Sequence, residues 1–371
     1  MSRSPLLLLT IAIVAVLLVL ATRVSTPAES AEDFRQRIVL PEQADLPQAP
    51  ELDAQQRMLE QDLQEIGANF AGVSGIAVTE ASGMATMAHN GAAPMPQQSV
   101  SKLWVTMTAL DLVDEGALDL SEPVTLRAED LTLFYQPTRN IVRSRGFFST
   151  DYADLMQRAI TQSDNTANDR LLRRVGGPQA VDAFMRRNRI SGVRFGTDER
   201  SKQSAIAGLE WRQAYSIDNA FYDARDRVPA EDRRRAFEAY LDDPVDGATA
   251  IGMAQALARL ARGDLLSDRS TALLLSTMAK TRSGPRRLKG GVPAGWTIAH
   301  KTGTGQVFDG TQSGYNDVGI LTAPDGTQYA VAVLIGQTRA SYAARMAMMQ
   351  DVTRAVVRHH ENREDTGAIE G

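Results

Sequence analysis

The distribution of apolar and polar residues divides the chain into regions of different periodicity. Apolar residues recur at helical spacing in residues 52–68, and two short alternating segments, residues 72–80 and 83–91, flank a tight turn at Ala81–Gly83. Helical patterns then dominate from Lys102 to about Gly291. Strand patterns return in three later segments, residues 295–305, 315–326 and 327–337, and a last helical pattern follows in residues 340–359.

This order of elements predicts an α+β fold. The first and last segments can form one antiparallel sheet covered by helices, and the long helical stretch forms a second lobe inserted between them. We therefore expect one catalytic domain over residues 51–360, with its helical lobe at about residues 102–291, and a disordered polar tail over residues 361–371. A cleft between two such lobes is the natural place for a binding site.

The segment before this domain has a different character. An uninterrupted apolar run covers residues 5–21, with Arg3 before it and Arg23 after it. This pattern is typical of an export signal, and its length is also just sufficient for a membrane anchor. We expect residues 1–23 to be a signal peptide or an N-terminal anchor, residues 24–50 to be a flexible tether, and the remainder to be periplasmic or otherwise exported.

Composition narrows the chemistry. The 371 residues carry a net charge of −5 without a long basic tract, which argues against a nucleic-acid partner. There is no cysteine, so disulfides, thiolate metal sites and cysteine nucleophiles are excluded. The four histidines have no spacing typical of zinc ligands and offer little for a His-dependent triad. We expect no metal, no cofactor and a monomer.

One serine and one lysine stand out at the start of the helical stretch. Ser99 and Lys102 are three residues apart, so on a helix they share one face. A serine hydroxyl needs a neighbouring base to become a nucleophile, and a helix N-terminus would also stabilise a developing oxyanion. The alternative is a helix-capping serine followed by an ordinary surface lysine.

Two further motifs contain the same kinds of group. Ser163, Asp164 and Asn165 precede a helix, where such residues usually act as caps. Lys301, Thr302 and Gly303 lie on a predicted strand; the lysine and threonine could hold a carboxylate, and the glycine could let a substrate backbone approach the strand edge. The alternative for the third motif is an edge strand protected by a lysine.

Taken in order, the three motifs resemble those of the class A β-lactamases and penicillin-binding proteins. The resemblance covers roughly residues 50–360, and the segments at residues 175–186, 242–257 and 315–326 bring it closer to the extended-spectrum class A group. It implies a serine hydrolase of that fold, with Ser99 as the acylated nucleophile and Lys102 as proton acceptor or relay. It further implies Ser163 as a proton shuttle, and substrate-binding roles for Asn165, Lys301, Thr302, Gly303 and Thr304, with the backbone N–H groups of Ser99 and Thr304 as the oxyanion hole.

The resemblance is weaker where the acyl-enzyme would be hydrolysed. Class A enzymes use a glutamate within a Glu-Pro-x-x-Asn pattern, whereas here Glu199 is followed by Arg200, and Gln203 replaces the asparagine. Glu199 lies at the expected distance from Asn165, with Glu210 as the reserve candidate. The stretch from Ala207 to Asp243 is longer than the family pattern, so we expect a rebuilt loop near the site.

Residues outside the three motifs also bear on the cleft. An arginine that binds the substrate carboxylate would have to come from Arg339 or Arg345, because the segment at residues 315–321 contains none. Tyr135 could form an aromatic wall. His300 alternates with Lys301 and should point to the opposite face of its strand.

We therefore expect a serine β-lactamase that hydrolyses the lactam amide through an acyl-enzyme on Ser99, with a β-lactam as its small-molecule partner. The alternative is a D-Ala-D-Ala peptidase or related cell-wall hydrolase, which would act on a peptidoglycan stem peptide and deacylate slowly. A tethered sensing module that is acylated once is a third and weaker hypothesis.

Overall fold

The computed structural model describes residues 51–370, with side chains up to residue 363. The expected leader and tether lie outside these residues. The strands are β1 Gly72–Glu80, β2 Thr86–His89, β3 Met95–Pro96, β4 Pro123–Leu126, β5 Phe148–Asp151, β6 Gly247–Ala248, β7 Thr297–Thr304, β8 Val307–Phe308, β9 Thr311–Gln312, β10 Tyr315–Thr322 and β11 Gln328–Thr338.

α-Helices and 3₁₀-helices connect these strands. The α-helices are α3 Ala54–Ala68, α4 Lys102–Asp114, α5 Thr138–Arg145, α6 Tyr152–Thr161, α7 Asn165–Arg174, α8 Pro178–Arg187, α9 Glu199–Ile206, α10 Ala220–Asp226, α11 Ala230–Asp242, α12 Ala250–Arg262, α13 Asp268–Ala279 and α14 Tyr342–Glu370. The 3₁₀-helices are η1 Gln98–Ser101, η2 Ala128–Asp130, η3 Gln213–Ser216 and η4 Leu288–Gly291.

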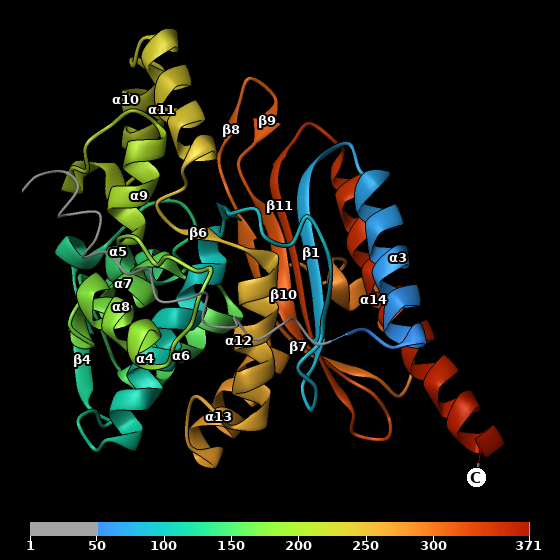
Figure 1. Ribbon diagram of the computed structural model, residues 1–371. Coiled ribbons are helices and arrows are strands. Elements are labelled where there is room, and N and C mark those ends of the chain that lie inside the picture. Colours follow the sequence, from blue (N-terminus) through green and yellow to red (C-terminus); the bar gives the residue numbers. More distant parts are fainter. Residues whose placement is uncertain (1–50, 371) are drawn as a thin grey trace, which may run out of the picture. The chain divides into compact units, whose positions relative to one another are not determined.

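The main sheet joins the first and last parts of the domain, as the sequence predicts. Its strands follow the order β2-β1-β11-β10-β7, all antiparallel, and β9 pairs with β11 and with β8 beside this path. Figure 1 shows helices α3 and α14 on one face of the sheet and α12 on the other. The predicted α+β fold is confirmed.

The alternation of side chains along β1 explains why both faces of the sheet are covered. Ile76 and Val78 belong to the apolar core under α3 and α14, whereas Ala77 belongs to the core that continues through α12 into the helical lobe. Successive residues of a strand point to opposite faces, so an apolar strand of this kind requires a layer on each side.

Helix α4 forms the centre of the helical lobe. Every residue from Lys102 to Leu110 is buried, which is typical of a helix surrounded by others. Its first turn follows η1, which places the start of α4 beside β7. The helical lobe also contains the short antiparallel pair of β4 and β5, and β6 pairs with β3.

The last helix corrects one expectation. We expected a helix ending near His359 and a disordered tail after it, but α14 continues to Glu370. Part of the reason is a tertiary contact, because Arg363 forms an ion pair with Glu80 at the end of β1. Sequence pattern alone does not distinguish a polar helix end of this kind from a frayed tail.

Candidate active site

Ser99 and Lys102 lie together at the entrance to α4. Ser99 belongs to η1, and Lys102 is the first residue of α4. The ammonium group of Lys102 donates a hydrogen bond to Ser99 Oγ at 2.8 Å and contacts Glu199 Oε1 at 2.7 Å. Lys102 is fully buried, and the Ser99 side chain caps no helix. The alternative of a capping serine with a surface lysine is therefore wrong.

The residue before Ser99 is held in an uncommon backbone conformation. Gln98 has φ 55°, in the left-handed region that costs a residue with a side chain about 1–3 kcal/mol. Its N–H donates to Asp246 Oδ2 at 2.9 Å, and its side-chain amide donates to the Tyr240 hydroxyl at 2.7 Å and to the Ser313 carbonyl at 2.9 Å. These contacts hold the turn that presents Ser99 to the cavity.

Glu199 is the first residue of α9, and it reaches the nucleophile through Lys102. Its N–H donates to Asp169 Oδ1 at 3.1 Å, which fixes the start of the helix against α7. Burial would raise the pKa of Glu199, but the ammonium groups of Lys102 and Lys202 outweigh it, so the pKa lies well below its usual range. Glu199 is therefore a carboxylate at neutral pH.

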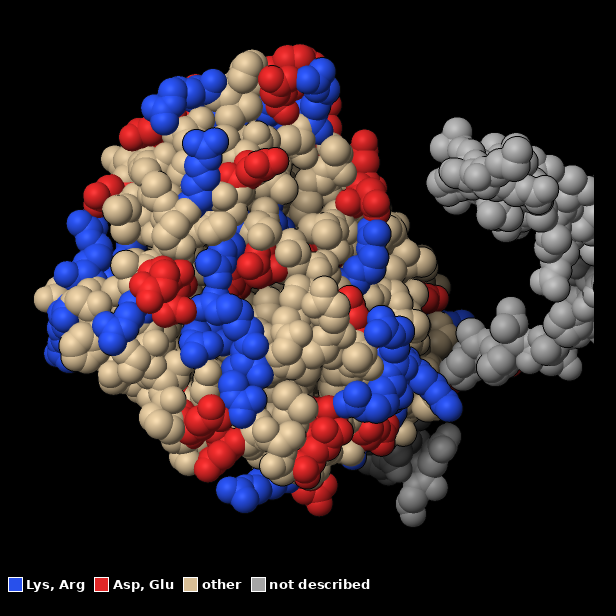
Figure 2. Space-filling model, turned by 90° about the vertical axis from the view of Figure 1, so that its left-hand side faces the viewer, with Lys and Arg blue, Asp and Glu red and all other residues tan. Residues whose placement is uncertain are grey.

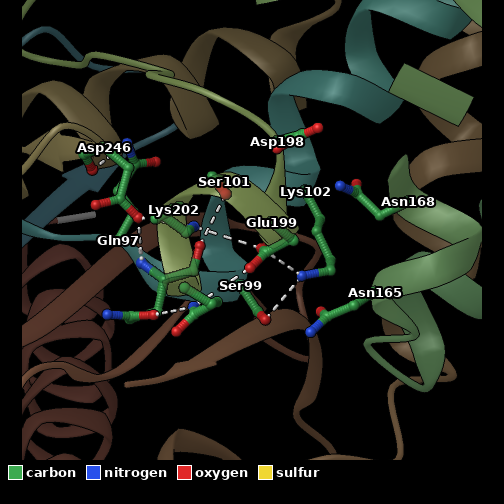
Figure 3. Close-up of polar contacts among 12 residues, drawn as sticks. Gln97, Ser99, Ser101, Lys102, Asn165, Asn168, Asp198, Glu199, Lys202 and Asp246 are labelled. Atoms are coloured by element: carbon green, nitrogen blue, oxygen red, sulfur yellow. Dashed lines mark hydrogen bonds and ion pairs between the residues drawn. The ribbon is translucent and has the colours of Figure 1, made fainter. Parts of the chain in front are cut away.

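The neighbours of Glu199 agree with the predicted placement. The Gln203 side-chain amide lies 3.4 Å from Glu199 Oε2, in the position where we expected it to replace an asparagine. Glu210, the reserve candidate, is exposed and does not line the cavity. Figure 3 shows Lys102, Glu199 and Ser99 converging on one another, with Lys202 on the far side of the carboxylate.

Lys102 carries its proton less firmly than a lysine in water does. Burial lowers its pKa, and although the Glu199 carboxylate opposes this change, the pKa remains below its ordinary value. A lysine that releases a proton more readily can exchange one with a bound hydroxyl group.

The second and third motifs meet across the cavity. The ammonium group of Lys301 donates to Ser163 Oγ at 2.9 Å and to the Thr302 carbonyl at 2.8 Å. Burial, and next the charge of Lys102, lower the pKa of Lys301 well below its ordinary value. Asp164 has a structural role: its side chain caps α7 and accepts hydrogen bonds from the N–H and hydroxyl of Thr138.

Asn165 presents a polar group to the cavity. Its side-chain nitrogen donates to the Leu133 carbonyl at 2.9 Å, whereas its oxygen is buried without a hydrogen-bond partner among the described residues. A buried polar atom that faces a cavity without a partner is suited to bind a ligand.

Together these groups surround a cavity of about 570 Å³. Its lining includes six of the predicted site residues: Ser99, Ser163, Asn165, Glu199, Thr302 and Thr304. Lys102 and Lys301 stand behind this lining and reach it through the two serines. Tyr135, 62% exposed, lies at the rim as the sequence predicts.

Gly303 has a packing role that the sequence did not indicate. It does not line the cavity, and a Cβ atom at this position would lie 2.3 Å from the Gln97 carbonyl oxygen. The missing side chain therefore lets β7 pack against the turn before Ser99. The expected approach of a substrate backbone to this strand edge stays a prediction.

The arginine near the third motif is Arg287, which the sequence analysis missed. Its guanidinium donates to Thr304 Oγ1 at 2.6 Å and to the Gly303 carbonyl at 2.9 Å, and it stacks on the ring of Tyr315 at 3.7 Å. Arg339 and Arg345 instead contact residues of β9, outside the cavity. Arg287 precedes η4, and no local motif signals that this loop returns to β7.

The long segment after α9 also reaches the site. It folds into α10 and α11, and Tyr222 and Arg225 of α10 line the cavity. The rings of Phe134, Phe221 and Tyr222 pack together with centroids 5.1–6.1 Å apart, and Phe134 and Tyr222 line the cavity. The expected rebuilding of this loop is thus a pair of helices.

His300 follows the prediction from strand alternation. It points away from the cavity, and its Nδ1 lies 2.8 Å from Asp317 Oδ1.

Within residues 51–370, no group of three or more His, Asp or Glu side chains is arranged to hold a metal ion. In this part of the chain, no helix combines the length and the apolarity that a membrane span needs. On the face shown in Figure 2, basic and acidic side chains lie interspersed.

The chain belongs to the beta-lactamase enzyme family, whose model matches residues 58–360. The extended-spectrum beta-lactamase PER-1 of Pseudomonas aeruginosa is 30% identical over 303 residues, which are 81% of this chain and 87% of that protein. The resemblance to the extended-spectrum class A group is confirmed.

Solved structures agree with this assignment. A beta-lactamase from Chitinophaga pinensis DSM 2588 has 26% identity and a TM-score of 0.64, with 80% of this chain and 97% of that chain covered. An ancestral class A beta-lactamase has 28% identity and a TM-score of 0.61, with 81% and 99% covered.

Proposed function

We propose that this protein is a serine β-lactamase that opens the lactam amide through an acyl-enzyme on Ser99. The observation that carries the proposal is the position of one ammonium group, that of Lys102, between the Ser99 hydroxyl at 2.8 Å and the Glu199 carboxylate at 2.7 Å. Nucleophile and base are thereby connected through one side chain that can exchange protons with both.

Acylation begins when Ser99 Oγ attacks the lactam carbonyl carbon. The hydroxyl proton passes to Lys102. A neutral Lys102 amine keeps this proton, whereas a Lys102 ammonium group passes a proton on to Glu199. The backbone N–H groups of Ser99 and Thr304 stabilise the oxyanion. The carbon–nitrogen bond then breaks, the nitrogen takes a proton from Ser163, and the proton that Ser99 released returns through the lysines to Ser163, which leaves Glu199 as a carboxylate again. Lys301, 2.9 Å from Ser163 Oγ, supports this transfer.

Deacylation uses the opposite side of the cavity. Glu199, held as a carboxylate, takes a proton from a water molecule that attacks the ester carbon. The ester bond breaks, Ser99 recovers its proton, and the opened acid leaves. The proximity of Glu199 to Lys102 favours this second step, and it distinguishes the proposed enzyme from a peptidase that would remain acylated.

Substrate binding follows from the groups around the third motif. Thr302, Thr304 and Arg287 line the cavity close to Lys301, so a substrate carboxylate would find two hydroxyl groups and two cations there. Asn165 would bind the amide of the acyl side chain, on the far side of Ser163.

The test is hydrolysis of a chromogenic cephalosporin by the purified protein and by Ser99→Ala. We expect the variant to lose about five orders of magnitude in turnover while it melts at the same temperature as the wild type. Undiminished turnover in the variant would overturn the mechanism. Mass spectrometry of the intact wild type after mixing separates the alternatives: rapid return to free enzyme indicates a lactamase, and an adduct that persists for hours indicates a peptidase.

We also propose that the domain acts after export. The proposal rests on the apolar run at residues 5–21 with Arg3 before it. Fractionation of expressing cells, with mass determination of the N-terminus, would establish the compartment and whether the leader is cleaved; retention in the cytoplasm would contradict export.

A further inference from the structure

Lys202 is a buried lysine that the proposed reaction does not use. It lies one turn after Glu199 on α9 and is only 2% exposed. Its ammonium group contacts Glu199 Oε1 at 3.4 Å and Asp246 Oδ2 at 3.0 Å. A lysine is rarely buried unless its charge is paired, so these two carboxylates account for its position.

Two ammonium groups therefore share one oxygen of Glu199. Lys102 approaches Oε1 at 2.7 Å and Lys202 approaches the same atom at 3.4 Å (Figure 3). Only Lys102 also contacts Ser99, so it is the one that can exchange a proton with the nucleophile. Lys202 bonds to carboxylates alone, and it can supply a constant positive charge.

We propose that Lys202 is a positioning residue that keeps Glu199 ionised and correctly oriented, so that deacylation continues at acidic pH. The proposal deepens the proposed function and rests on it. Its physical basis is the preference of a carboxyl group for its charged form when a cation lies within about 4–6 Å.

Asp246 completes the arrangement from the other side of the lysine. It accepts hydrogen bonds from Lys202, from the Gln98 N–H at 2.9 Å and from the Tyr240 hydroxyl at 2.9 Å. Burial would lower the pKa of Lys202, but Asp246 and then Glu199 raise it above its ordinary value. The same carboxylate thus keeps Lys202 charged and fixes the turn before Ser99.

The charged groups around Glu199 come from every element packed against it. Besides Lys102 of α4 and Lys202 of α9 itself, they are Asp169 of α7, Asp198 and Arg200 at the start of α9, Asp246 before β6 and Lys301 of β7, and the neutral but titratable hydroxyl of Tyr240 of α11 also faces this cluster. Among these, Lys102 and Lys202 are the cations in contact with the carboxylate.

The direction of the effect follows from the charges. A cation lowers the pKa of Glu199, and the base form exists above that pKa. Removing Lys202 raises the pKa, so the acidic limb of the deacylation rate moves to higher pH. We expect an upward movement of about one pH unit or more. At the low end of the pH range in which the protein stays folded, the variant should then accumulate acyl-enzyme that the wild type does not.

The experiment compares two variants that break the same ion pair with opposite changes of charge. Lys202→Met removes the cation, and Asp246→Asn removes the anion with almost no change of shape. The deacylation rate of each is measured from pH 8.5 down to the lowest pH at which the protein stays folded, together with the fraction of acylated protein by mass spectrometry. The acidic limb of the pH–rate profile should move to higher pH in Lys202→Met, and it should stay in place or move to lower pH in Asp246→Asn. Limbs that move in the same direction in both variants would show a merely structural role and overturn the proposal.

A second measurement does not depend on turnover. The side-chain carboxyl ¹³C signal of Glu199, assigned by its loss in Glu199→Gln, is titrated in the wild type and in Lys202→Met. A higher midpoint in the variant supports the proposal, and equal midpoints overturn it, whether or not β-lactams are hydrolysed. Absence of lactam hydrolysis in the wild type would instead overturn the proposed function.

Folding of the variants is controlled in the same design. Lys202→Met leaves Asp246 buried without its cation, which can destabilise the protein. If it does not fold, the double variant Lys202→Met/Asp246→Asn removes both charges. Lys202 is in contact with Glu199, whereas Asp246 lies on the far side of the lysine. The acidic limb of the double variant should therefore still lie at higher pH than that of the wild type, by less than in Lys202→Met. An unchanged limb would overturn the proposal.

Discussion

The two sides of the cavity are held in place by different forces. On the strand side, Thr302 and Thr304 occupy β7, where the register with Asp317 and Tyr315 of β10 fixes their positions through backbone hydrogen bonds. On the helix side, Glu199 belongs to a helix of eight residues whose charged side chains hold it against its neighbours. The strand side should therefore keep its geometry when a nearby charge is removed, whereas the geometry and ionisation of the helix side should depend on charge and pH.

The largest expected effect lies on the helix side. Glu199→Gln keeps the shape of the side chain but removes the base, so deacylation should slow by about 10²–10⁴-fold while acylation of Ser99 continues. Mass spectrometry should then detect a long-lived adduct on Ser99. If this variant returned to free enzyme as fast as the wild type, Glu199 would not be the base. The proposed difference between the helix side and the strand side would then be wrong.

The next effect concerns stability on the same side. Burial first, and then the charges of Asp198 and Glu199, raise the pKa of Asp169 to about 7. An unfolded aspartate titrates near 4, so the stability that Asp169 contributes is fully present below about pH 4 and is lost as the pH rises through about 7. The loss corresponds to at most about 4 kcal/mol.

Asp169→Asn tests this effect because it is neutral at every pH. Between pH 4 and 7, the free energy of unfolding of the wild type should fall relative to that of the variant. Denaturant unfolding at several pH values provides the measurement. Parallel curves would contradict the assigned direction.

A smaller effect should distinguish the strand side. Arg287→Gln removes a cation beside Thr304, and a hydrogen bond to a charged group contributes about 1.5–3 kcal/mol, so kcat/KM for β-lactams should fall roughly 10–150-fold. The deacylation rate should stay unchanged. As a control, a β-lactam whose carboxylate is esterified should lose much less; an equal loss would indicate a distorted strand.

The smallest expected effect lies in the support behind Ser99. Tyr240→Phe removes the hydroxyl that bonds to Asp246 and Gln98, both of which keep other partners. We expect a loss of about 1 kcal/mol, visible as a decrease of roughly 2 °C in Tm. A loss of several kcal/mol would mean that this hydroxyl, more than Asp246, holds the turn at Gln98.

The sequence by itself determined the elements and the chemistry that short motifs carry. Apolar periodicity was sufficient to predict α3, β1, β10 and β11, since each of these elements buries a regular face. The spacing of Ser99 and Lys102 was sufficient for their contact, because three residues separate neighbours on a helical turn. The order of three motifs then indicated the family.

Tertiary structure alone decided which distant charges meet. Lys202, Asp246 and Arg287 show no local pattern, and their roles come from partners on other elements, for example Lys202 with Asp246 at 3.0 Å. For Gly303, only the tertiary structure shows a packing requirement, because a Cβ atom there would lie 2.3 Å from the Gln97 carbonyl oxygen. The physical reason is that periodicity reports which face of an element is buried, whereas the energy of a charge depends on the full three-dimensional set of neighbours.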